Sequence, residues 1–126
     1  IPKLSKALPP GFPNDVPIYE KDGGTVVLDT YFQREGGQNA FVVTFLTRDA
    51  DVDVINFYTK EFQKRGWTVK DAPTSPGDFA LTIEFDDAKP TKEVQGTIRA
   101  DVYAEDADFT EVNLIVQVSA SRGRGN

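Results

Sequence analysis

Three residue types that often carry chemistry are absent from this chain of 126 residues, which has no cysteine, no histidine and no methionine. Without cysteine no disulfide can form, so cysteine usage gives no indication of the redox compartment. The usual protein ligands of zinc and copper are also missing. A Ser–His–Asp triad is excluded for the same reason. These absences remove the commonest routes to nucleophilic and metal-assisted catalysis.

Basic residues are fewer than acidic ones. The chain has 14 Lys and Arg and 20 Asp and Glu, so its net charge is −6. Nucleic acid and anionic membrane surfaces attract clustered Lys and Arg, so neither is expected as a partner. The negative charge could suit a cationic partner or Ca²⁺, but simple solubility is the explanation that we favour. No apolar run approaches the ~20 residues of a membrane span, so we expect no span in this chain.

Two catalytic arrangements remain open without histidine. A serine could pair with a lysine, but the serines fall in expected loops, tails or a strand end, and none has a motif around it. Two carboxylates could hydrolyse a glycoside, but no spacing identifies such a pair. We therefore expect a protein that is not an enzyme and that holds no cofactor.

Proline concentrates near the beginning of the chain, at Pro2, Pro9, Pro10, Pro13 and Pro17. Proline prevents a helix and disfavours a central strand. Large apolar residues are interspersed from Leu8 to Tyr19, more than a linker usually carries. We expect residues 1–7 to be a tether and residues 8–120 to be one domain, whose first segment packs as extended chain over the domain's edge. Residues 121–126 are expected to form a flexible tail.

Six stretches have the composition or the alternation of β-strands: residues 25–34, 38–47, 67–71, 79–85, 94–102 and 111–118. The last three alternate with period two, and the alternation in the first of these places Phe79 on the apolar face with Leu81. Such patterns indicate an antiparallel sheet with one face in the core. We predict an α+β fold in the order β-β-α-β-β-β-β, a curved antiparallel sheet with one helix on its concave face.

The clearest helix runs from about residue 50 to residue 65. Val54, Tyr58 and Phe62 recur every four residues and form an apolar stripe on one face. Gly66 can supply the left-handed stop, and Trp67 can then close on Phe62. This stretch therefore predicts an amphipathic helix that ends in a Schellman motif.

Asp49, Asp51 and Asp53 could begin a calcium loop. Such a loop needs glycine at its sixth position and glutamate at its twelfth, where this chain has Val54 and Lys60. We therefore assign the aspartates to the start of the helix, where Asp49 or Asp51 can cap the first turn.

Glu105, Asp106 and Asp108 form a second acidic group, in the expected last hairpin loop. Loop carboxylates can gather a hard cation, and Asp86 and Asp87 could add oxygens if both loops lie at the same end of the sheet. A solvated polar turn explains the same residues and is the interpretation that we favour.

Three aromatic residues are candidates for a partner-binding surface. Tyr31 and Tyr103 fall on the faces opposite the apolar sets of their strands, and Phe57 lies beside the main helix stripe. Aromatic residues are enriched in binding surfaces. Alternatively they are half-exposed, or residues 8–19 cover them, which is the explanation that we favour.

Two segments resemble a known group of domains. Residues 10–19, PGFPNDVPIY, contain the stretch P-x-F/W-P-x-D-V/I-P, and Phe57-Tyr58 with Gly66-Trp67 gives the pattern F-Y…G-W. Both resemble uncharacterised domains of bacterial secreted proteins and lipoproteins, in which the first stretch follows a lipid-anchor linker. The resemblance implies an α+β fold and an extracytoplasmic location, and it brings no catalytic residues.

The chain begins at Ile1 and not at methionine, so we expect a processed or excised form with a possible lipid anchor upstream. We expect a non-enzymatic extracytoplasmic module that binds another envelope protein or supports assembly. The alternative is a domain that binds a small molecule or Ca²⁺ with the concave face of the sheet or with the acidic loops.

Overall fold

A computed structural model describes residues 8–20, 25–72, 74–87 and 93–119. The expected tether, residues 1–7, and the expected tail, residues 121–126, lie outside these ranges. The described residues form six strands and one helix: β1 (Val26–Glu35), β2 (Gln38–Thr47), α1 (Asp51–Lys64), β3 (Thr68–Asp71), β4 (Leu81–Asp86), β5 (Val94–Val102) and β6 (Thr110–Ser119).

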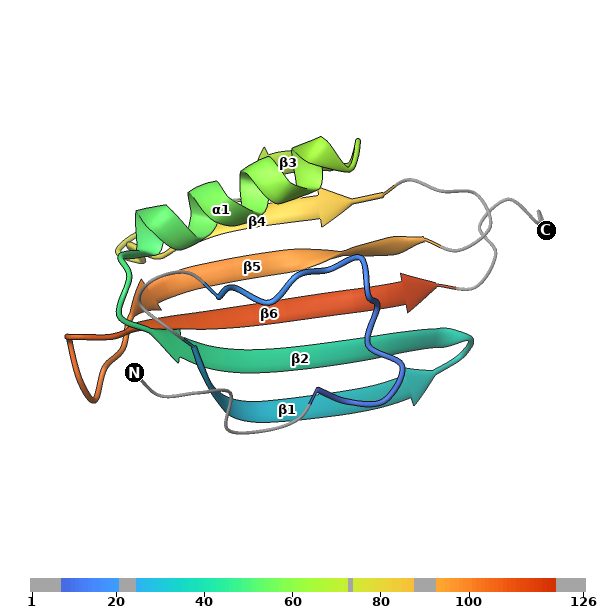
Figure 1. The fold of residues 1–126 in the computed structure, drawn as a ribbon, viewed down its shortest axis with the longest axis horizontal. Helices are drawn as coiled ribbons and strands as arrows, with labels where there is room; N and C mark the ends of the chain where they lie inside the picture. Colours follow the sequence, from blue (N-terminus) through green and yellow to red (C-terminus); the bar gives the residue numbers. More distant parts are fainter. Residues whose placement is uncertain (1–7, 21–24, 73, 88–92, 120–126) are drawn as a thin grey trace.

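The six strands join in one open, curved sheet with the order β1-β2-β6-β5-β4-β3, and every neighbouring pair is antiparallel. The helix α1 lies on one face of this sheet and contacts β3, β4 and β5 (Figure 1). We call this side the helix face and the opposite side the open face. The predicted α+β fold, with a single helix on an antiparallel sheet, is confirmed.

The helix ends as predicted but begins differently. Gly66 adopts a φ of 79°, and the N–H of Trp67 donates to the carbonyl of Phe62 at 3.0 Å, as in a Schellman motif. At the start, Ala50 is the N-cap and makes no side-chain cap hydrogen bond, so the predicted N-cap at Asp49 or Asp51 is wrong, although the carboxylate of Asp51 accepts the N–H of Val52 at 2.7 Å within the first turn. The carboxylate of Asp49 instead accepts the hydroxyl of Tyr19.

The period-two alternation of residues 79–85 predicts that Phe79 lies in the core, and this prediction is wrong. The side chain of Phe79 is 86% exposed, and β4 begins only at Leu81. The reason lies at Asp78, whose carboxylate accepts the N–H of Ala80 at 3.0 Å and two hydrogen bonds from Arg99 at 2.8 and 2.9 Å. The guanidinium of Arg99 also holds the pKa of Asp78 below its usual range. These bonds turn the chain before β4, so Ala80 is buried and Phe79 lies outside.

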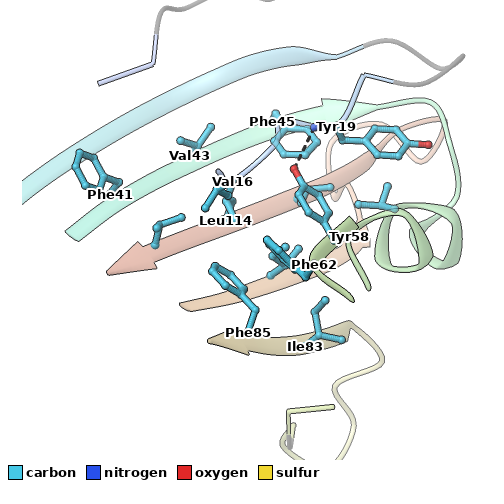
Figure 2. Packing of buried hydrophobic residues seen from close by; sticks show 14 of the residues in the cluster. Val16, Tyr19, Phe41, Val43, Phe45, Tyr58, Phe62, Ile83, Phe85 and Leu114 are labelled. Carbon is cyan, nitrogen blue, oxygen red and sulfur yellow. Dashed lines mark hydrogen bonds between the residues drawn. The ribbon is translucent and has the colours of Figure 1, made fainter. Parts of the chain in front are cut away.

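Residues 8–20, which we call the strap, cover the part of the helix face that α1 leaves free (Figure 1). Phe12 packs edge-on against Phe41 of β2 with ring centroids 5.7 Å apart, and Val16 and Tyr19 are buried in the core. Figure 2 shows Val16 and Tyr19 among the core residues of the sheet and of α1. The strap was expected as extended chain at the edge of the domain, but it crosses the helix face.

Two backbone hydrogen bonds close turns within the strap, from Phe12 to Pro9 and from Val16 to Pro13, each at 3.2 Å. Proline has no N–H to donate to a ladder, and it favours turns. The strap therefore covers the core mainly with side chains.

Candidate functional site

An open hollow of about 410 Å³ lies where the strap meets α1 and the connection before it. We call it the strap hollow. It is lined by Tyr19, Asp49, Asp53, Asn56, Phe57, Lys60 and Glu61. Residues three and four apart share one flank of a helix, so the lining residues of α1 form a single stripe. The strap and one flank of α1 are therefore the two walls of the site.

Tyr19 is fixed by contacts on several sides. Its hydroxyl donates to the carboxylate of Asp49, and its N–H donates to the hydroxyl of Tyr58 at 3.0 Å (Figure 2). Thr25 donates a hydrogen bond to its carbonyl. The ring meets Phe57 edge-on, with centroids 5.1 Å apart. The aromatic wall of the hollow is thus preorganised, which lowers the entropic cost of binding.

The hydroxyl of Tyr58 lies beneath this wall and is fully buried. Burial raises the pKa of Tyr58 far above its usual value, because the phenolate would lose its hydration. The hydroxyl therefore stays neutral and acts as a structural acceptor for the strap.

Three carboxylates and one ammonium line the strap hollow, from Asp49, Asp53, Glu61 and Lys60, so its formal charge is −2. Glu61 is paired with Arg65 at 2.9 Å and with Lys64 at 3.3 Å, and these cations lower its pKa. The two aspartates stand at the end of α1 where the helix begins. A negative rim beside aromatic rings favours a cation that carries an apolar part.

The structure does not bring the three predicted aromatic residues together. Phe57 lines the strap hollow and is covered by Tyr19, as the favoured explanation expects. Tyr31 is 55% exposed on the open face, where the strap does not reach. Tyr103 follows the last residue of β5, and its hydroxyl donates to Glu105 at 2.9 Å, which raises its pKa.

Glu105, Asp106 and Asp108 are exposed in the loop between β5 and β6. The carboxylate of Asp106 accepts the backbone N–H of Asp108 at 3.0 Å. Asp86 and Asp87 lie at the other end of the sheet, because β4 ends where β5 begins. The described residues contain no group of three or more Asp, Glu, His or Cys that is able to hold a metal ion.

Sequence reasoning missed most of the strap hollow. Asp49 and Asp53 were assigned to the start of the helix, and Tyr19 lies 30 residues before Asp49 in the chain. The polar residues at positions 53, 56 and 60 follow one flank of the predicted helix, and this pattern could have indicated one wall of the hollow. The pattern could not identify the strap as the second wall.

One family model matches the chain, from residue 27 to residue 100, and its description is START domain-like. This stretch covers more than half of the chain and includes every lining residue of the strap hollow except Tyr19. No curated protein and no solved structure matches. Within the described residues, no helix has the length and apolar character needed to cross a membrane.

Proposed function

The chain belongs to the START domain-like family, and we propose that it is a ligand-binding module and not an enzyme. The strap hollow takes a small cationic ligand with an apolar part. The observation that carries this proposal is the ring of Phe57, which the buried Tyr19 holds in place, beside the carboxylates of Asp49 and Asp53. The volume of about 410 Å³ lies within the range of roughly 300–1,000 Å³ typical of small-molecule sites.

The expected affinity is modest, because the site is open to solvent. A partly exposed ion pair contributes about 0–1 kcal/mol, and a cation over an exposed ring about 0.5–1 kcal/mol. Burial of an apolar ring against Phe57 adds to these contributions. We expect Kd values between roughly 0.1 and 1 mM for a first probe.

The proposal is tested by titrating the protein with phenethylamine while the backbone amides are observed by NMR. We expect saturable shifts in the first half of α1 and around Tyr19. The matched neutral compound, phenethyl alcohol, should bind several-fold more weakly. Asp53→Asn should weaken phenethylamine binding about three- to fivefold, the equivalent of a partly exposed charge pair.

Asp51→Asn is the matched control for this experiment, since Asp51 stands in the same helical turn but does not line the strap hollow. It should leave phenethylamine binding unchanged. Equal binding of the amine and the alcohol, or equal losses in both variants, would show that the hollow does not recognise a cation.

The absence of enzymatic activity is part of the same proposal. The chain has no histidine and no cysteine, and the hydroxyl of Tyr19 in the hollow is engaged by Asp49. These observations support a role in which the ligand is held and not transformed. Turnover of a bound amine by the purified protein would contradict it.

We further propose that the protein acts outside the cytoplasm, anchored through a lipid on a segment upstream of Ile1, with another envelope protein as its partner. The Pro-rich stretch from Pro10 to Tyr19 and the pattern Phe57-Tyr58…Gly66-Trp67 support this location through their resemblance to secreted bacterial domains. Expression of the complete reading frame with a C-terminal tag tests it. We expect a processed, lipid-labelled product in the envelope fraction. Unprocessed protein in the cytosolic fraction would disprove it.

A further inference from the structure

The open face of the sheet carries a contiguous patch without charge. One row across the strands is Tyr31, Val42, Ile115 and Thr97, on β1, β2, β6 and β5. The next row is Gln33, Ala40, Gln117 and Gln95 on the same strands. We call these eight residues the neutral patch. No described element covers it, and Tyr31 and Ile115 are 55% and 38% exposed.

The absence of charge is unusual for this chain, of which 27% is charged. Among the residues that the structure describes, charged side chains on this face stand only around the patch. Glu84 and Lys70 continue the first row on β4 and β3, where they form an ion pair at 3.5 Å, and Asp86 continues the second row. Binding surfaces typically have few charged residues at the centre and polar or charged residues at the rim, as this face does.

A hollow of about 340 Å³ adjoins the neutral patch over β3, β4, β5 and β6. Gln95, Thr97 and Gln117 belong to both the patch and the hollow, and the Lys70–Glu84 pair stands at its far side. From β5 to β1 there are three strand spacings, or about 14 Å. The hollow and the neutral patch therefore form one continuous surface on the open face, which extends to the exposed ring of Tyr31.

The chemistry of the neutral patch selects a neutral ligand rich in hydroxyl groups. Glutamine side chains both donate and accept hydrogen bonds, as sugar hydroxyls do. The exposed ring of Tyr31 offers an apolar surface to the C–H face of a sugar ring. A charged ligand would find no counter-charge within the patch and would lose hydration there. We propose that the open face binds a neutral oligosaccharide, which lies across β1, β2, β6 and β5 with one unit on Tyr31.

A second copy of the chain fits this surface less well. The apolar part of the patch consists of Tyr31, Val42, Ile115 and Ala40, whereas a stable interface buries about 800 Å² on each partner around an apolar core. The proposed oligosaccharide site is separate from the strap hollow, since the sheet lies between them.

Titrations with cellohexaose and with hexa-N-acetylchitohexaose, followed through the backbone amides by NMR, test the proposal. We expect at least one of these neutral probes to shift signals of β1, β2, β5 and β6 and to leave those of α1 in place. Tyr31→Ala should weaken binding roughly tenfold, whereas Tyr31→Phe should keep the affinity, because the ring is what contacts the sugar.

Tyr103→Ala is the matched control, since Tyr103 is a second partly exposed tyrosine that lies outside the patch, and it should bind like the parent protein. Asp53→Asn should also bind the oligosaccharide normally, which separates this proposal from the one on the strap hollow. Absence of binding by both probes would overturn the proposal. An affinity that Tyr31→Ala leaves unchanged, or a dimer in light scattering that Tyr31→Ala dissociates, would also overturn it.

Discussion

Replacing Phe62 with alanine is expected to lower the free energy of unfolding by about 3–5 kcal/mol. The side chain of Phe62 is fully buried and stacks on Phe85 at 4.4 Å and on Trp67 at 5.1 Å between ring centroids. It connects α1 to β4 and to Trp67, which follows the stop at Gly66. The loss would be a large share of the roughly 5–15 kcal/mol that stabilises a typical domain.

Urea unfolding measures this effect, with the slope of the transition checked so that the change is assigned to stability. Gln63→Ala is the matched control, because Gln63 is exposed on the next position of α1. We expect its cost to stay below about 0.5 kcal/mol. A cost below about 1 kcal/mol for Phe62→Ala would mean that the ring stack does not hold α1 on the sheet.

Replacing Gly96 with alanine is expected to destabilise the fold by about 3 kcal/mol, which is at the upper end for overpacking. A Cβ atom at this position would lie 1.8 Å from the carbonyl oxygen of Ile115 and 3.0 Å from the ring of Phe85. The oxygen belongs to the backbone of β6, so relief requires β5 and β6 to move apart. Glycine is thus required here because the two backbones approach closely.

Thermal and urea unfolding of Gly96→Ala measure the effect, with Thr97→Ala as the control on the adjacent residue of β5. Thr97 lies on the open face and is only half-buried, so its truncation should cost less than about 1 kcal/mol. If Gly96→Ala were as stable as the parent protein, the close approach of β5 and β6 would not exist in solution.

The local elements of the fold could be predicted because their signals lie within a few residues of one another. The helix stripe with Gly66 and Trp67 is contiguous in sequence, and the strand alternation needs only a short window. The errors came where a distant partner intervenes. Phe79 lies outside because Arg99 engages Asp78, and Asp49 does not cap α1 because it binds Tyr19.

The candidate sites were less predictable, because each depends on how separate segments meet. Phe57 was identified from the sequence, but its hollow exists only because the strap places Tyr19 beside it. Tyr31 was identified as well, but the patch residues Ile115 and Gln117 can be placed in the same rows only once β6 is known to lie between β2 and β5. A pattern within one strand carries no information about the strand beside it.

The position of β6 beside β2 also governs how the chain folds. The β1–β2 hairpin and the successive pairs among β3, β4, β5 and β6 join segments that are near in sequence. The ladder between β2 and β6 instead joins Gln38 to Ser119 and Thr47 to Thr110. Forming the β2–β6 ladder costs the entropy of closing a long loop before its contacts form. Such long-range pairing is typical of domains that fold in milliseconds to seconds. We therefore expect formation of this ladder to limit the folding rate, with the β1–β2 hairpin and the sheet of β3 to β6 formed before they join.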